Sequence, residues 1–185
     1  MAELAALEAK AQDCQACPLG ATRTTLVWGS GNPHARVMFI GEAPGKNEDE
    51  GGLPFIGAAG RVLDEFLERA GLKREDIYIA NVLKCRPPGN HDPQPSEIEA
   101  CQHWLVDQIH TIQPRVIVTL GAFSTRWALA KPVAISAVQG QVFEHSNTYG
   151  EYLIIPSYHP AATIYDLNKK DDFFRVADYL AKLQL

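Results

Sequence analysis

The sequence predicts an α/β fold in which helices cover both faces of a parallel β-sheet. Short apolar runs alternate along the chain with segments whose apolar residues recur at helical spacing. Strands that alternate with helices are joined by right-handed crossovers, which place the strands parallel and the helices on both sides of the sheet. The length of 185 residues suits a single domain over residues 1–185.

The expected strands are short apolar runs that end at glycine or at polar residues. They lie at 37–40, 77–80, 115–120, 141–145 and 152–156, with 25–28 as a candidate edge strand and a turn at 147–150. The expected helices span 2–13, 60–70, 96–112, 121–129 and 171–183. Ser96 and Glu99 have the spacing of a capping box. The glycine- and proline-containing segments 18–35, 41–57 and 86–95 are expected to be loops.

The composition excludes several classes of protein. The chain is 46% hydrophobic and 21% charged, as in ordinary globular proteins, which excludes a disordered or coiled-coil chain. The formal net charge of −5 excludes a strongly basic nucleic-acid binder but leaves a local basic patch open. Because the sequence has neither an apolar run long enough to cross a membrane nor a signal peptide, we expect a cytoplasmic protein without membrane contact.

Four cysteines, Cys14, Cys17, Cys85 and Cys101, are the most specific feature of the composition. The first two form a C-x-x-C pair, and no signal peptide directs the chain to an oxidising compartment. The sequence therefore favours a metal or cluster site over two disulfides. The spacing alone does not separate zinc from iron-sulfur.

Polar residues follow several of the expected strands. In an open parallel sheet, ligands bind beyond the carboxyl ends of the strands. The residues there are Gly-Glu-Ala-Pro-Gly at 41–45, Asn81, and Ser-Tyr-His-Pro at 157–160. Position alone therefore makes Asn81 and His159 candidates for a binding or catalytic site.

These segments together resemble the family 4 uracil-DNA glycosylases, the iron-sulfur branch of the uracil-DNA glycosylase superfamily. The shared motifs are C-x-x-C at 14–17, Gly-Glu-Ala-Pro-Gly at 41–45, Gly-Leu-Pro-Phe-Ile-Gly at 52–57, Asn-Val-Leu-Lys-Cys-Arg-Pro-Pro-Gly-Asn at 81–90, Cys101 and His-Pro-Ala-Ala at 159–162. The resemblance implies a three-layer α/β/α fold around a mostly parallel four-stranded sheet. It also implies a DNA repair enzyme that flips uracil out of DNA and hydrolyses its N-glycosidic bond, leaving an abasic site.

The resemblance implies a structural [4Fe-4S] cluster held by Cys14, Cys17, Cys85 and Cys101. This cluster would join the N-terminal segment to the loop that follows Asn81. The alternative that the residues leave open is a structural zinc ion.

Two residues carry the chemistry that the resemblance implies. His159 would donate a hydrogen bond to uracil O2 as negative charge develops there. Glu42 would orient water or stabilise the cationic sugar. Ala43 stands where other branches of the superfamily carry an aspartate that positions the attacking water, so Glu42 is the remaining candidate for this role.

The base would be held by the residues around these two. Phe55 would stack on uracil, Asn81 would bind its Watson–Crick edge, and backbone N–H groups from Gly41 to Ala43 would add contacts. Glu48 would exclude the C5 methyl group of thymine. Taken without the resemblance, Phe55 is better explained as a core residue, and Glu48 is equally explained as a solvated loop acid.

DNA contacts are expected at the edges of the site. Lys84 and Arg86 are candidates for phosphate contacts, and so are Lys169 and Lys170. Asn90, beside His91, stands where a related branch has a histidine that bonds covalently to the sugar, and we expect ordinary turnover instead. Ile164 or Tyr165 would be the wedge that enters the duplex, in place of a Leu-Leu-Arg motif common in the family.

The expected partner is uracil-containing DNA, single- or double-stranded, bound by a monomer. Two alternatives come from other functional classes. The first is a non-catalytic protein that binds uracil-containing or damaged DNA without cleaving it, which Ala43 and the acidic net charge support. The second is a zinc-stabilised α/β binding module unrelated to DNA.

Overall fold

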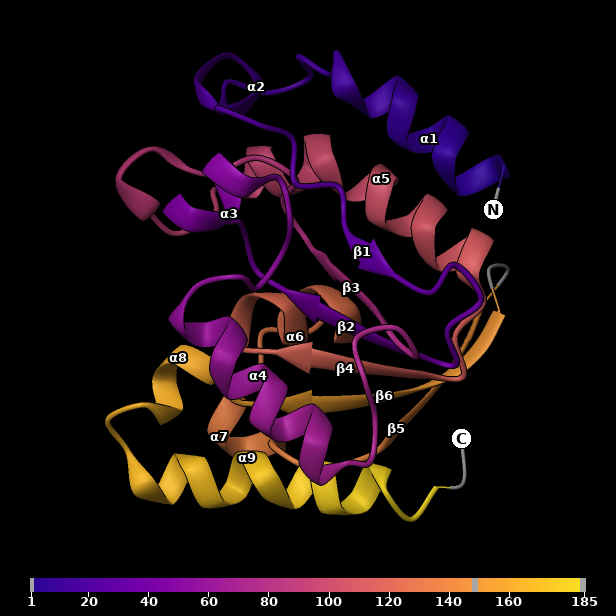
Figure 1. The fold of residues 1–185 in the computed structure, drawn as a ribbon, viewed down its shortest axis with the longest axis vertical. Coiled ribbons are helices and arrows are strands. Elements are labelled where there is room, and N and C mark those ends of the chain that lie inside the picture. The colour runs from indigo at the N-terminus through magenta and orange to yellow at the C-terminus, as the bar shows by residue number, and fades with distance from the viewer. Residues whose placement is uncertain (1, 148–149, 184–185) are drawn as a thin grey trace.

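The computed structural model describes residues 2–147 and 150–183, which form a six-stranded sheet with helices on both faces (Figure 1). The strand order is β1-β3-β2-β4-β6-β5. The strands are β1 (Ser30–Gly31), β2 (Val37–Gly41), β3 (Tyr78–Asn81), β4 (Val116–Leu120), β5 (Phe143–Asn147) and β6 (Gly150–Ser157). The four central strands are parallel, and β1 and β5 pair antiparallel at the two edges. The expected three-layer fold is confirmed, but the sheet has six strands rather than the four that the resemblance implied, because β1 and β5 extend it at the two edges.

Two helical layers cover the sheet. One face packs against α1 (Ala2–Gln12), α5 (Pro95–Ile112) and α6 (Ala122–Leu129), and the other against α4 (Ala58–Arg69) and α9 (Leu167–Leu180). Alternate side chains of β2 enter the two cores, with Met38 and Ile40 on the α5 side and Phe39 on the α4 side. Burial on both faces is the reason that the central strands appear in the sequence as continuous apolar runs.

Five short helices were not predicted from the sequence. Three of them, α2 (Leu19–Thr22), α3 (Lys46–Gly51) and η1 (Pro88–Asn90), lie within segments that were expected to be loops, and α7 (Ile135–Val138) and α8 (Pro160–Thr163) lie where no element was expected. Each has one or two turns, so none leaves a clear apolar periodicity in the sequence. Two of them, α3 and α8, directly follow the ends of parallel strands (left in Figure 1).

Three local predictions are wrong. The edge strand is Ser30–Gly31 rather than 25–28, although Val27 N donates a hydrogen bond to Lys84 O at 2.9 Å. The capping box of α5 uses Gln94 and Glu97, two residues before the predicted pair, with Pro95 in the first turn. The last helix begins at Leu167 rather than 171 because the Asp166 side chain accepts a hydrogen bond from Lys169 N.

The predicted turn at 147–150 falls between β5 and β6, and its residues 148–149 lie outside the described part of the chain. Within the described residues, no helix combines the length and the apolar character needed to cross a membrane.

A buried polar side chain ties one helical layer to the sheet. Gln108 of α5 has no exposed surface, and its Nε2 donates to Trp28 O at 2.9 Å and to the Tyr78 hydroxyl at 3.3 Å. Its Oε1 accepts a hydrogen bond from Lys84 Nζ at 2.5 Å. Gln108 therefore connects α5, the segment before β1, strand β3 and the loop after β3.

The substitution Gln108→Leu keeps the volume of the side chain but leaves buried polar groups without partners. We expect the free energy of unfolding to fall by about 1–3 kcal/mol. Equilibrium urea denaturation measures this loss. In the matched control Gln12→Leu, at an exposed position of α1, the change should stay within about 0.5 kcal/mol. Equal effects of the two substitutions would contradict the role given to Gln108.

Candidate active site

The carboxyl ends of the parallel strands open onto a cavity of about 400 Å³, a volume suited to a small ligand. Most of the residues predicted to bind or cleave the substrate line it, and they come from four separate segments of the chain. They are Glu42, Ala43, Glu48, Phe55, Asn81, Asn90 and His159, joined by Pro87 and His91.

The pairing of β2 with β3 continues past the ends of both strands. Val82 N donates to Gly41 O, and Leu83 N donates to Glu42 O, each at 3.0 Å. Within the ladder, Gly41 lies directly beside Asn81. Backbone hydrogen bonds therefore hold Glu42 and Asn81 on neighbouring segments at one wall of the cavity.

Asn81 presents a buried and unpaired polar atom. The residue is 2% exposed, and its Oδ1 has no hydrogen-bond partner among the described residues. A Cβ added at Gly41 would overlap Asn81 Oδ1 and come within 2.7 Å of Phe55 Cζ. The glycine thus leaves free the space between the amide and the aromatic ring. An orphaned amide oxygen in such a place is stabilised by a ligand that brings an N–H group.

Phe55 is buried and lies beside His159, with ring centroids 5.7 Å apart and an angle of 33° between the planes. Its backbone is left-handed, with φ of 54°, which is uncommon for a residue other than glycine. The interpretation of Phe55 as an ordinary core residue is therefore incomplete, because its ring also borders the cavity.

His159 follows β6 and caps the short helix α8. Its Nδ1 accepts a hydrogen bond from Ala161 N at 3.2 Å, so the proton of the neutral ring resides on Nε2. Burial lowers the pKa of His159 to about 4, while the negative charge of Glu48 acts in the opposite direction. At neutral pH the ring is therefore uncharged, and its Nε2–H is a donor.

Two carboxylates border the cavity in different environments. Burial raises the pKa of Glu42 above its ordinary value, and the negative charge of Asp92 adds to the rise. Glu48 Oε1 accepts hydrogen bonds from Ile56 N at 2.9 Å and from Gly57 N at 2.8 Å. Glu48 is thus a fixed part of the loop that carries Phe55, and not the solvated acid that its charged neighbours in the sequence would allow.

The four cysteines are brought together at a second place. All are free thiols, and all line one small cavity between the start of α2 and the first half of α5. Arg23 Nη1 contacts Cys85 Sγ at 3.2 Å, and Lys84 N donates to Cys101 Sγ at 3.4 Å. N–H donors of this kind stabilise the negative charge of thiolate ligands.

The cavity and its donors fit a thiolate-bound group. Among the residues described, no group of three or more His, Cys, Asp or Glu side chains is arranged to hold a single metal ion. An iron-sulfur cluster places its sulfur ligands farther apart than one ion does, because irons and sulfides lie between them. The lack of a site for a single metal ion among the described residues therefore does not argue against a cluster.

The model of the uracil DNA glycosylase superfamily matches residues 28–183. The chain belongs to this superfamily. It is 44% identical over 179 residues to the type-4 uracil-DNA glycosylase of Archaeoglobus fulgidus, which covers 92% of the chain and 90% of that protein. The corresponding protein of Saccharolobus solfataricus is 44% identical over 91% of the chain and 82% of its own length. That of Thermotoga maritima is 45% identical over 82% of the chain and 78% of its own length. The predicted family is confirmed.

The prediction that Lys84 contacts DNA is wrong. Lys84 is 1% exposed, and its Nζ donates to Asn81 O at 2.9 Å and to Gln108 Oε1. A side chain buried in this way does not reach a phosphate group. Its Nζ instead supports the loop between Asn81 and Cys85 through these two hydrogen bonds.

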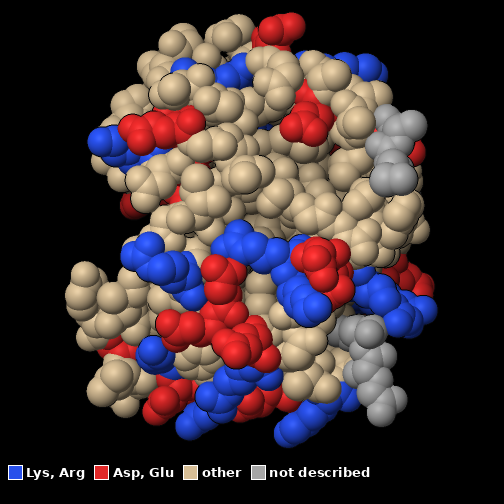
Figure 2. Space-filling view, in the orientation of Figure 1, with Lys and Arg blue, Asp and Glu red and all other residues tan. Residues whose placement is uncertain are grey.

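The other residues predicted to touch DNA lie in three places. Arg86 and Asn90 are at the rim of the cavity, Ile164 and Tyr165 are in the loop between α8 and α9, and Lys169 and Lys170 are in the first turn of α9, where they pair with Asp166 and Glu65. Arg86 Nε donates to Asn90 Oδ1 at 2.8 Å, and Asn90 is exposed with φ of 54°. Ile164 is 41% exposed and Tyr165 is 95% exposed, between α8 and α9. The face seen in Figure 2 carries charged side chains of both signs over α4 and α9 and a mostly uncharged band above them.

Two residues of the site were not predicted from the sequence. His91, noted only as a neighbour of Asn90, lines the cavity itself, and its Nδ1 lies 2.9 Å from Asp92 O. Arg74 lies far from every motif, yet its guanidinium reaches the backbone of Phe55, with Nη2 at 2.7 Å from Phe55 O. The place of His91 beside Asn90 could have predicted its position, whereas no sequence neighbour of Arg74 belongs to a motif of the site.

We expect the imidazole of His159 to be neutral at pH 7, with its proton on Nε2, and to titrate near pH 4. Burial disfavours the charged ring, so its pKa lies well below the ordinary value of about 6.5. Nitrogen-15 NMR of labelled imidazole measures both the tautomer and the midpoint. A His159 midpoint above 6 would contradict the expected neutral donor.

Proposed function

We propose that the chain flips uracil out of DNA and hydrolyses its N-glycosidic bond, releasing the free base and leaving an abasic site. The observation that carries the proposal is one cavity that holds three complementary groups, namely an unpaired amide on Asn81, a neutral imidazole donor on His159 and the carboxylate of Glu42. The relatives that are 40–45% identical are all named type-4 uracil-DNA glycosylases, which supports the same activity.

Asn81 and Phe55 would recognise the base. Uracil presents an N3–H donor next to the O4 acceptor, and a side-chain amide accepts the first and donates to the second. The unpaired Asn81 Oδ1 would thereby gain the donor that it lacks. The Phe55 ring would stack on the flipped base, and backbone N–H groups between Gly41 and Ala43 would complete its surroundings.

His159 would stabilise the leaving group. When the glycosidic bond breaks, negative charge develops on uracil O2, and the Nε2–H of a neutral imidazole donates to it. A preorganised donor of this kind typically contributes a factor of about 10²–10³ to kcat. Because the ring stays neutral at physiological pH, it donates a hydrogen bond without giving up a proton.

Glu42 would face the sugar on the other side of the bond that breaks. The sugar gains positive charge in the transition state, and a carboxylate stabilises this charge and orients the water that attacks C1′. Ala43, at the position of the usual aspartate, offers no group for this task. The raised pKa of Glu42 means that the carboxylate is lost at a higher pH than that of an ordinary glutamate.

Glu48 would exclude thymine. The fit of a pocket alone separates the binding free energies of two ligands that differ by one methyl group by only about 1–3 kcal/mol. Glu48 is held by two backbone hydrogen bonds, so it forms a wall that yields little to a C5 methyl group. This combination of a braced side chain and close fit would favour uracil over thymine.

The partner would be uracil-containing DNA, single- or double-stranded, bound by a monomer. Arg86 and Asn90 at the rim would contact the backbone of the flipped nucleotide. The exposed Ile164 and Tyr165 would fill the gap that the flipped base leaves in a duplex. Basic groups limited to the rim fit the acidic net charge of the whole chain.

Cys14, Cys17, Cys85 and Cys101 would hold a [4Fe-4S] cluster. The cluster would supply structural cross-linking, because hydrolysis of a glycosidic bond requires no electron transfer. It would tie the segment between α1 and α2 to the start of α5 and to the loop that begins at Asn81.

If the cluster is present, the purified protein should be brown and should have a broad absorption band at about 400 nm, which is typical of thiolate-bound iron clusters. The substitution Cys85→Ala should remove most of this absorption and lower the melting temperature. Ultraviolet-visible spectra and metal analysis measure both iron and zinc. Colourless wild-type protein that carries zinc would contradict the cluster and favour the structural zinc site.

We expect His159→Ala to lower kcat for uracil release from an oligonucleotide by about 10²–10³, since the donor to O2 is lost. The substitution His34→Ala, at an exposed position away from the cavity, is the matched control and should leave kcat unchanged. Tight binding of the oligonucleotide by wild-type protein without any release would overturn the proposed activity and favour a non-catalytic DNA-binding protein.

A further inference from the structure

The backbone at Phe55 is held in a conformation that an unconstrained phenylalanine rarely adopts. Its φ of 54° lies in the left-handed region, which disfavours residues with a Cβ. Such a conformation persists only where the surrounding structure fixes it. Some part of the molecule must therefore hold the segment 54–57, because the position of the ring follows from this backbone.

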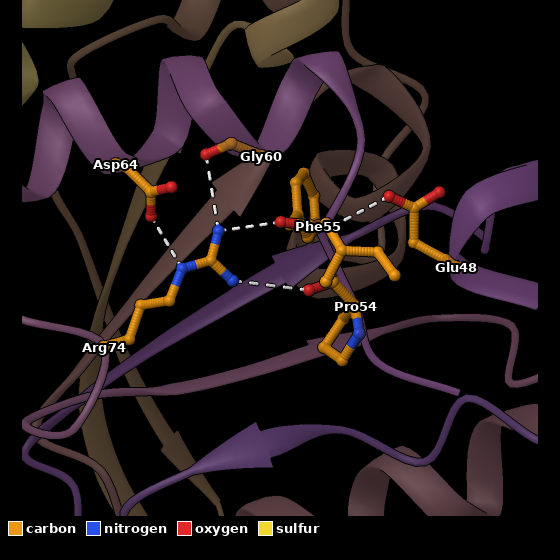
Figure 3. Close-up of polar contacts among 7 residues, drawn as sticks. Glu48, Pro54, Phe55, Gly60, Asp64 and Arg74 are labelled. Atoms are coloured by element: carbon orange, nitrogen blue, oxygen red, sulfur yellow. Dashed lines mark hydrogen bonds and ion pairs between the residues drawn. The ribbon is translucent and has the colours of Figure 1, made fainter. Parts of the chain in front are cut away.

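Arg74 supplies that support from the loop between α4 and β3. Its Nη2 donates to Phe55 O at 2.7 Å and to Gly60 O at 3.3 Å, and its Nη1 lies 3.5 Å from Pro54 O (Figure 3). Asp64, on the first turns of α4, accepts a hydrogen bond from Arg74 Nε at 2.6 Å and fixes the plane of the guanidinium. One planar group thus binds three carbonyl oxygens around the strained residue.

The chain is adapted to this contact on two further sides. A Cβ at Gly60 would overlap the Phe55 carbonyl, so glycine is needed for the loop to approach α4 this closely. From the opposite side, Glu48 accepts the N–H groups of Ile56 and Gly57. The carbonyls of the segment are therefore held by a cation and its N–H groups by an anion. Figure 3 shows Arg74 and Glu48 on opposite sides of Phe55.

We infer that Arg74 is a positioning residue that sets the Phe55 ring for base recognition. This inference rests on the proposed stacking role of Phe55. Apart from its ion pair with Asp64, Arg74 hydrogen-bonds to backbone carbonyls, and it lies outside the lining of the cavity, so its effect on the base passes through Phe55. Lysine carries the same charge but lacks the planar fork that binds several carbonyls at once.

The inference predicts a selective loss of uracil recognition in Arg74→Met. The probe is an oligonucleotide with 2′-fluoro-2′-deoxyuridine, in which the fluorine slows cleavage of the glycosidic bond. Its Kd should rise about tenfold, while the Kd of the matching thymidine oligonucleotide stays within twofold. The substitution Arg74→Lys should recover only part of the loss. The control Arg69→Met removes a surface ion pair with Asp178 and should change neither Kd.

A double-mutant cycle with Phe55→Ala separates positioning from general stabilisation. If Arg74 acts through Phe55, Arg74→Met adds little to the loss already caused by Phe55→Ala. Two outcomes would overturn the inference while leaving the proposed function intact. In the first, the fold-changes in Kd of the two single variants multiply in the double variant; in the second, Arg74→Met weakens binding of uracil and thymidine oligonucleotides equally. If Phe55→Ala alone changes no Kd, the stacking role is wrong and the inference falls with it. All variants are compared below their melting temperatures, which excludes unfolding as the cause.

Discussion

The hydrogen bonds that extend the β2–β3 pairing beyond the strands fix Glu42 and Asn81 side by side, and the other groups of the site are arranged around this wall. Val82 and Leu83 continue the ladder onto the carbonyls of Gly41 and Glu42. This register puts Gly41 beside Asn81 and turns the following segment toward the cysteine cavity. Shifting a strand by one residue would exchange its two faces and remove the cavity. The site is therefore as rigid as the centre of the sheet on which it is built.

Loops complete the site, and buried polar contacts keep them in place. The loop after β3 is held by Lys84, whose Nζ bridges the Asn81 carbonyl and Gln108. The loop before α4 is held between Arg74 and Glu48. In both cases a long polar side chain binds backbone groups of the loop. Such contacts give loops the precision that a preorganised binding site needs.

The electrostatic environment is consistent with a reaction that separates charge. Burial keeps the imidazole of His159 neutral and raises the pKa of Glu42. A neutral donor would then face the base as it becomes negative, and a carboxylate would face the sugar as it becomes positive. The two groups come from opposite ends of the chain, and each is supplied at the end of a parallel strand.

The amino-acid sequence alone determined the alternation of strands and helices, the location of the site beyond the strand ends, and the family. Burial periodicity and short motifs are local properties, so Asn81 and His159 could be identified from position, and the four cysteines could be grouped. Only the tertiary structure decided that Lys84 is buried rather than a DNA contact, and that Arg74 supports Phe55. Both outcomes depend on which side chains from distant segments surround a charged group, and no local pattern in the sequence encodes those neighbours.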